Sequence, residues 1–184
     1  MILIPVVAVL AVIAVAVIAI YNGLVRLNVQ AGNAWADIDV QLKRRSDLIP
    51  NVVETVKGYA SHERQTLEAV VNARNRAVSA QGAGPAERAQ AEGALTGALR
   101  GLFALAEAYP QLRAAENFGQ LQGTLAQIEE AVQSARRYYN AVVRDLNTRI
   151  QQFPSNTIAS MFGFKTREFF EIADTERAVP QVKF

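Results

Sequence analysis

The residue types that usually carry out catalysis or bind metals are scarce in this sequence. His62 is the only histidine, and the 184 residues include no cysteine. A carboxylate-bridged di-metal centre in a helical bundle needs two Glu-x-x-His pairs, and a zinc protease helix needs two histidines four residues apart. A single histidine satisfies neither pattern. Without cysteine there is also no disulfide, thiolate nucleophile or cysteine-ligated zinc or iron–sulfur site.

Two other arrangements that support chemistry in proteins fail on geometry. Ser61 and Glu63 are the immediate neighbours of His62. Adjacent helical positions point about 100° apart, so these three side chains do not form a local catalytic triad. Gly82 and Gly84 follow no strand and therefore do not form a phosphate-binding loop. We expect no catalytic residue, no metal and no cofactor, and we interpret His62 as a solvated surface residue.

The charged residues are nearly balanced, with 19 Lys and Arg against 17 Asp and Glu and a formal charge of +2. This balance does not indicate binding to nucleic acid. The basic triplet at residues 43–45 suggests contact with anionic lipid. It lies about 35 Å beyond Ile20 along a continuous helix, several Debye lengths from a membrane. Because Asp39 and Lys43 are also spaced as an i,i+4 ion pair, we interpret this stretch as a solvated helical face.

The amino-terminal end has the composition of a membrane anchor. Its first 20 residues contain no charged side chain, and the apolar run from Ile2 to Ile20 is about 28 Å long as a helix, enough to cross a bilayer. A cleaved signal peptide is the alternative, but no basic residue precedes the run, and bulky Ile18 and Tyr21 stand where small residues are needed for cleavage. We therefore predict an uncleaved anchor over residues 1–22, with Tyr21 at the lipid–water boundary.

The distribution of basic residues predicts the orientation of the anchor. Only the α-amine precedes the apolar run, whereas Arg26 and the triplet at residues 43–45 follow it. The positive-inside tendency then places the short amino terminus outside and the rest of the chain in the cytoplasm.

Apolar residues with helical spacing continue from Leu24 to Leu42, and no proline separates them from the apolar run. The first helix should therefore extend from the bilayer to about Arg45, and the stretch from Ser46 to Pro50 should end it and begin the next. Further helices are predicted over about 51–81, from about 86 to 109 and from 117 to 153, separated by Gly- and Pro-containing breaks. β-Branched alternation of period two is absent from these segments, so we expect essentially no strand. The prediction is an all-α fold, an elongated antiparallel helical bundle of about four long helices over residues 23–154, with the transmembrane helix continuing into the first of them.

Residues 155–184 differ from the bundle in composition. Ser155 or Asn156 is expected to cap a short helix near Ile158, and aromatic residues without a clear period follow, among them Phe162 and Phe164. Two interpretations stay open: the rings close one end of the bundle, or they form an exposed docking site.

The third predicted helix has two distinct faces. Its leucine side points nearly opposite to glycines that recur every four residues, Gly93, Gly97 and Gly101. Glycine inside a helix costs about 1 kcal/mol relative to alanine, so close approach of another helix would compensate. We predict that the leucine face builds the chain's own core and that the glycine face packs against a neighbouring protomer or partner. Glycines that are merely tolerated, or that pack tightly within the monomer, remain the alternative.

Several segments resemble the LemA family of bacterial single-pass membrane proteins, and they follow one another in the same order along nearly the whole chain. These segments are Asn33 to Arg45, Asp47 to Glu63, Ala135 to Asn140, Phe153-Pro154, Phe162-Gly163-Phe164 and Phe169-Phe170-Glu171. The resemblance implies an amino-terminal anchor, an antiparallel helical bundle in the cytoplasm and no established enzymatic activity. It brings no catalytic residues to transfer.

Taken together, these features predict a non-catalytic, self-associating scaffold or adaptor at the bacterial inner membrane. Its expected partners are the lipid bilayer, further copies of itself and another membrane protein. The alternative is a regulatory binding module that docks a membrane enzyme such as a protease through the aromatic segment. Candidate contact residues are Asp37, Asp39, Arg44, Arg45, Arg136, Arg137, Phe162 and Phe164.

Overall fold

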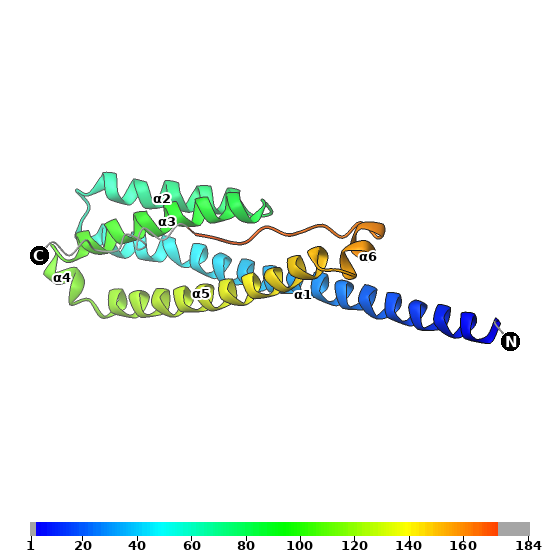
Figure 1. Ribbon diagram of the computed structural model, residues 1–184. Helices are drawn as coiled ribbons and strands as arrows, with labels where there is room; N and C mark the ends of the chain where they lie inside the picture. The colour runs from blue at the N-terminus through cyan, green and yellow to red at the C-terminus, as the bar shows by residue number, and fades with distance from the viewer. Residues whose placement is uncertain (1–2, 173–184) are drawn as a thin grey trace, which may run out of the picture. The chain divides into compact units, whose positions relative to one another are not determined.

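The computed structural model describes residues 3–172, and helices account for most of them (Figure 1). The helices are α1 (Leu3–Tyr59), α2 (Arg64–Ser79), α3 (Pro85–Ala106), α4 (Pro110–Arg113), α5 (Glu116–Gln151) and α6 (Ser155–Met161). No strand occurs between residues 3 and 172, which confirms the all-α prediction. The continuous α1 also confirms that the apolar run extends directly into the first bundle helix.

The chain packs as two compact units. Among the described residues, the first unit combines 3–37 with 135–169, and the second combines 38–134 with 170–172. In the first unit, the part of α1 that follows its exposed apolar start runs antiparallel to the last stretch of α5; in the second unit, α2 and α3 are antiparallel neighbours (Figure 1). Each unit combines residues from more than one of the three segments predicted from the sequence, which are the anchor over 1–22, the bundle over 23–154 and the carboxyl-terminal segment over 155–184.

The predicted break between Ser46 and Pro50 is wrong, because α1 continues through Pro50 to Tyr59. Proline inside a helix removes the hydrogen bond to the carbonyl four residues earlier, which here belongs to Ser46. In the structure Arg74 Nε donates to this Ser46 carbonyl at 3.2 Å. Ile49 and Val52 are buried on either side of Pro50, so burial of the helix face and the replacement donor together sustain the helix through the proline.

The break between α1 and α2 lies further along the chain than predicted. The expected helix over 51–81 is interrupted at residues 60–63, where the chain turns from α1 into α2. His62 is exposed in this turn, as predicted. The turn is held by Tyr109, whose hydroxyl donates to Glu63 Oε1 at 3.0 Å. The apolar residues Val56 and Leu67 kept helical spacing across the turn, so their pattern did not reveal it.

The other helix boundaries follow the predicted breaks closely. The loop between α2 and α3 contains Gly82 with a φ of 83°, a backbone conformation that favours glycine. Helix α3 ends at Ala106, and Pro110 begins the short helix α4, which was not predicted. The leucine side of α3 is buried in the core of the second unit, as predicted, together with residues of the neighbouring helices that include Val52, Val56, Val70, Leu95, Leu99, Leu102 and Phe118.

The segment after α6 runs back along the helices of its own unit. Asn147 on α5 brackets the backbone of Arg167: its Nδ2 donates to the Arg167 carbonyl at 2.8 Å, and its Oδ1 accepts from the Arg167 amide at 2.9 Å. Tyr139 Oη also donates to the Glu168 carbonyl at 2.9 Å. Ser155 does not cap α6 as predicted; its hydroxyl lies within hydrogen-bond distance of the carbonyls of Arg149 and Gln152 and thereby closes the end of α5.

Candidate functional site

The first candidate site is the apolar start of α1. Its side chains extend into solvent all around the helix: residues 3–16 are all exposed, including Leu10 and Ile13. Among the described helices, α1 is the one that is long and apolar enough to cross a membrane. A buried helix of a soluble protein would have the same composition, but none of this apolar stretch is buried. It therefore has the form of a single membrane-spanning segment.

Packing begins where the apolar stretch ends. The ring of Tyr21 lies 4.8 Å from that of Phe162 and 5.9 Å from that of Phe164, measured between centroids. Leu24, one turn further along α1, is completely buried. The segment after α6 is thus held against α1 at the level of the predicted lipid–water boundary. Phe162 nevertheless remains exposed, whereas Phe164 is half-buried.

The second candidate site is a buried ion cluster in the second unit. Arg45 from α1 and Arg88 from α3 are each 1% exposed, and Glu92 from α3 is 0% exposed. Glu92 Oε2 lies 3.6 Å from Arg45 Nη1, and Glu92 Oε1 lies 3.4 Å from Arg88 Nη2. Two carboxylates that are partly exposed complete the cluster: Glu129 Oε2 lies 3.5 Å from Arg45 Nη1, and Asp39 Oδ1 lies 3.9 Å from Arg88 Nε.

Hydrogen bonds fix the two guanidinium groups further. Arg45 Nη2 donates to Thr96 Oγ1 at 2.7 Å, and that hydroxyl donates in turn to the Glu92 carbonyl at 3.0 Å. Arg88 Nη1 donates to the carbonyl of Ala77 and so links α3 to the end of α2. The cluster thereby joins residues of α1, α2, α3 and α5.

Desolvation dominates the electrostatics of Glu92. Burial raises the pKa of this carboxyl above its ordinary value, although the neighbouring Arg45 and Arg88 lower it; Glu129 and Asp39 add smaller raising effects. The two arginines therefore offset only part of the cost of burying the carboxylate.

A cleft of about 680 Å³ opens beside the cluster. Its apolar wall includes Leu99, Phe103 and Leu125. Its polar lining consists of Arg45, Thr96, Arg100, Gln122, Glu129 and Gln133. Arg45 is paired with both Glu92 and Glu129. Nowhere in residues 3–172 does a group of three or more His, Cys, Asp or Glu assemble that could hold a metal ion. The cleft offers apolar and ionic contacts.

The sequence did not single out Arg88 and Glu92, although a signal for both was present. Glu92 falls on the same helical stripe as Leu95 and Leu99, and Arg88 lies one turn before it. Arg45 was predicted as a surface contact, which the structure corrects: it occupies the apolar stripe of α1 and points into the core. A charged residue on an otherwise apolar stripe predicts a buried ion pair, because a buried charge needs a partner.

The remaining predicted contact residues lie at or near the surface. Asp37, Arg44 and Arg137 are exposed, and Asp39 and Arg136 are half-buried. They belong to both compact units, and Asp39 is engaged with Arg88 of the ion cluster.

The glycine stripe of α3 is largely open. A Cβ atom added at Gly93 would meet Ile172 Cγ2 at 3.7 Å, whereas at Gly97 and Gly101 it would meet no described atom within 4 Å. Gly97 and Gly101 therefore do not serve close packing among the residues that the structure describes. Their role as an oligomer interface stays a prediction.

Comparison with known proteins relates the chain to one family. A family profile described as "LemA family" matches residues 34–184. Magnetosome protein MamQ of Magnetospirillum gryphiswaldense is 25% identical over 189 residues, covering 88% of this chain and 70% of that protein. Protein LemA of Metamycoplasma hominis is 25% identical over 158 residues, covering 85% of this chain and 71% of that protein.

Proposed function

Because the chain belongs to the LemA family, we propose that it is a single-pass protein of the bacterial inner membrane that acts as a self-associating scaffold or adaptor without catalytic activity. The observation that carries this proposal is the start of α1, whose apolar side chains are exposed around the whole helix. In water this surface would promote aggregation; in a bilayer it is matched by lipid.

The proposed mechanism is an increase in local concentration. An anchor confines the packed units to the membrane surface, and weak contacts between copies are then strengthened because several form at once. Gly97 and Gly101 support a self-association surface, since they leave a smooth, exposed strip on α3 that a second helix can approach closely. In the proposed orientation, the amino terminus is outside and Arg26 and the rest of the chain are cytoplasmic.

Membrane anchoring is tested by placing one charge inside or outside the apolar stretch. Val12 is 69% exposed and Val29 is 54% exposed, and both lie on α1. A lysine at the centre of a membrane helix costs about 3 kcal/mol, so Val12→Lys should weaken retention of the chain in carbonate-washed membranes, and Val29→Lys should not. Release of the unmodified chain by the carbonate wash would refute the anchor.

Orientation is tested by labelling one introduced cysteine. The natural chain contains no cysteine, so the label can react at that position alone. A Val71→Cys variant places one thiol on the exposed surface of α2. In intact spheroplasts, a membrane-impermeant maleimide should label it only after permeabilisation. Labelling without permeabilisation would reverse the orientation.

Self-association is tested with matched helical glycines. Gly97 and Gly123 are both exposed, and a Cβ at either position meets nothing within 4 Å. Gly97→Leu should lower the yield of crosslinked oligomers in intact membranes, whereas Gly123→Leu should leave it unchanged. Equal yields from both variants and the unmodified chain would exclude this stripe as the interface.

The alternative function is a regulatory binding module that docks a membrane enzyme such as a protease. The observation that favours it is the exposed Phe162 beside the anchor. A Phe162→Ser variant should then lose a crosslinked partner protein while self-association persists.

A further inference from the structure

We propose that α6 and its flanking residues form a second membrane contact, an interfacial platform that sits among anionic lipid headgroups next to the anchor. The platform consists of the apolar side chains of Phe153, Met161 and Phe162 together with the basic residues Arg149 and Lys165. The inference rests on the proposed anchoring of α1 and goes beyond it, because it assigns a lipid-binding role to residues far from the anchor in sequence.

The position of the platform follows from its contacts with α1. The exposed apolar stretch of α1 ends near Ile20, and Tyr21 comes next. The ring of Phe162 lies 4.8 Å from that of Tyr21. A headgroup layer is about 5–7 Å thick on each side of the hydrocarbon core. With the apolar stretch in lipid, Phe162 therefore lies within that layer.

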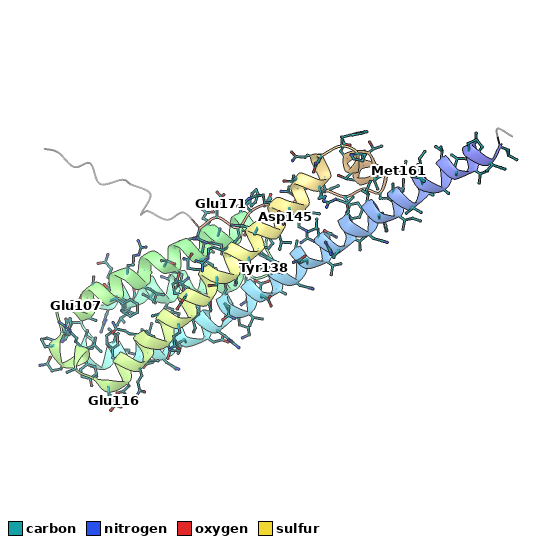
Figure 2. The ribbon with its side chains drawn as sticks, turned by 60° about the horizontal axis from the view of Figure 1, so that its bottom comes forward. Glu107, Glu116, Tyr138, Asp145, Met161 and Glu171 are labelled. Carbon is teal, nitrogen blue, oxygen red and sulfur yellow. The ribbon has the colours of Figure 1, made fainter. Side chains whose placement is uncertain are left out.

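The exposure of the platform is unusual for its composition. Phe153 is 80% exposed, Met161 is 71% exposed and Phe162 is 52% exposed. Phe153 lies in the connection between α5 and α6, and Met161 is the last residue of α6 (Figure 2). Three large apolar side chains within one short stretch of chain indicate an interaction surface. Phe162 joins this stretch to the apolar stretch of α1 through its contact with Tyr21, and this continuity identifies lipid as the surface that covers the platform.

The charged side chains of the platform itself are basic and complement anionic lipid, and Asp145 and Glu168 lie at its borders. Residues 146–167 include Arg149, Lys165 and Arg167 and no acidic residue. On α1, Arg26 is the only charged residue before Asp37. Arg26, Arg149 and Lys165 are exposed, while Arg167 donates from Nη2 to Asn28 Oδ1 at 3.0 Å and holds the segment against α1. A basic residue near an anionic membrane surface contributes about 1 kcal/mol to binding, and the attraction falls off within a Debye length.

The test measures depth in the bilayer with a tryptophan probe. Trp35 is the only tryptophan, so a Trp35→Phe background provides a silent full-length chain for reconstitution in vesicles of phosphatidylcholine with phosphatidylglycerol. Phe162→Trp reports the platform, and Ile13→Trp reports the anchor. Tyr138→Trp is the matched control, because Tyr138 is 49% exposed in the same unit but lies on the middle stretch of α5 (Figure 2).

The expected result is a graded pattern of quenching by brominated lipids. Ile13→Trp should be quenched most by bromine deep in the acyl chain, and Phe162→Trp most by bromine near the headgroup. Tyr138→Trp should be quenched several-fold less than Phe162→Trp. With Arg149→Gln and Lys165→Gln added, quenching of Phe162→Trp should decrease in vesicles that contain phosphatidylglycerol and should change little in vesicles of phosphatidylcholine alone.

The controls separate failure of the platform from failure of the anchor. If Ile13→Trp is quenched but Phe162→Trp behaves like Tyr138→Trp, the platform is refuted, and its apolar surface is left for a partner protein. If Ile13→Trp is not quenched either, the anchoring itself is refuted. Should Phe162→Trp disturb folding, as judged by far-UV circular dichroism, a spin label on Met161→Cys measures the same depth. Accessibility to a water-soluble nickel complex equal to that of a label on Tyr138→Cys would then overturn the inference.

Discussion

The passage of α1 through Pro50 leads to a prediction about three residues. Pro50 has no amide hydrogen, so the Ser46 carbonyl lacks its helical donor. Arg74 Nε supplies the replacement at 3.2 Å. The perturbation is Arg74→Met, which keeps the aliphatic part of the side chain and removes the donor. It is made both in the natural sequence and in a Pro50→Ala background, where the amide at position 50 restores the helical hydrogen bond.

The expected magnitude follows from the burial of Ser46, which is 1% exposed, so water does not readily reach its carbonyl. Leaving a buried acceptor unpaired costs about 1–3 kcal/mol. Arg74→Met should therefore lower the free energy of unfolding by about 1–3 kcal/mol in the natural sequence and by less than about 0.5 kcal/mol in the Pro50→Ala background. The difference between these two values is the coupling between Pro50 and Arg74.

The assay is urea unfolding of the full chain in detergent micelles, followed by far-UV circular dichroism. Arg76→Met is the matched control, because Arg76 lies on the same helix, is exposed and makes no hydrogen bond to Ser46. This control should change the free energy of unfolding by less than about 0.5 kcal/mol, as for other surface substitutions. Equal destabilisation by Arg74→Met in both backgrounds would show that the Ser46 carbonyl is not what Arg74 stabilises.

Three further predictions concern the ion cluster and the segment after α6. Arg45→Met should lower the free energy of unfolding, measured in urea, by about 3–5 kcal/mol, because it leaves the buried Glu92 without one of its two arginines. A loss below about 1 kcal/mol is typical of an exposed ion pair and would contradict the burial of the Arg45–Glu92 pair. Burial raises the pKa of Glu92, so the folded chain binds this proton more tightly than the unfolded chain, and the stability that Glu92 contributes falls as the pH rises from about 4.3 through the raised pKa. Urea unfolding at several pH values should therefore show the unmodified chain losing stability relative to Glu92→Gln over that range, and a constant difference would oppose this. Asn147→Ala removes both hydrogen bonds to the Arg167 backbone and should lower the local stability of the segment after α6 by about 1–3 kcal/mol. The measurement is amide hydrogen exchange at Arg167, which should become faster. Unchanged exchange would mean that Asn147 does not hold this segment.

The sequence predicted best where the signal is local. The loop before α3 contains Gly82 and Gly84 and is followed by Pro85, and Pro110 comes shortly after the end of α3 at Ala106, so both breaks could be identified. Pro50 carries the same local signal, yet the helix continues through it, because Arg74 and the buried neighbours of Pro50 come from the tertiary fold. The turn at residues 60–63 contains neither glycine nor proline, and it was missed.

The candidate sites divide in the same way. The apolar helical stretch that is long enough to cross a bilayer could be predicted because an uncharged apolar run of that length is a property of consecutive residues. Arg45 could not be placed correctly from its neighbours Lys43 and Arg44, because its partner Glu92 lies on another helix. Its position on an apolar stripe was the available signal, and it identifies burial without identifying the partner.

The amino-acid sequence by itself determined that this chain is helical, that its first helix begins with an apolar stretch able to cross a bilayer, and which leucines of α3 face the core. These properties depend on composition and on periodicity along one helix. The tertiary structure alone decided which distant groups meet: the Arg74 guanidinium with the Ser46 carbonyl, and Phe162 with Tyr21. Such pairs join residues far apart in the chain, and they form because a buried polar group needs a partner and an apolar ring needs a surface, requirements that packing satisfies and that no local pattern records.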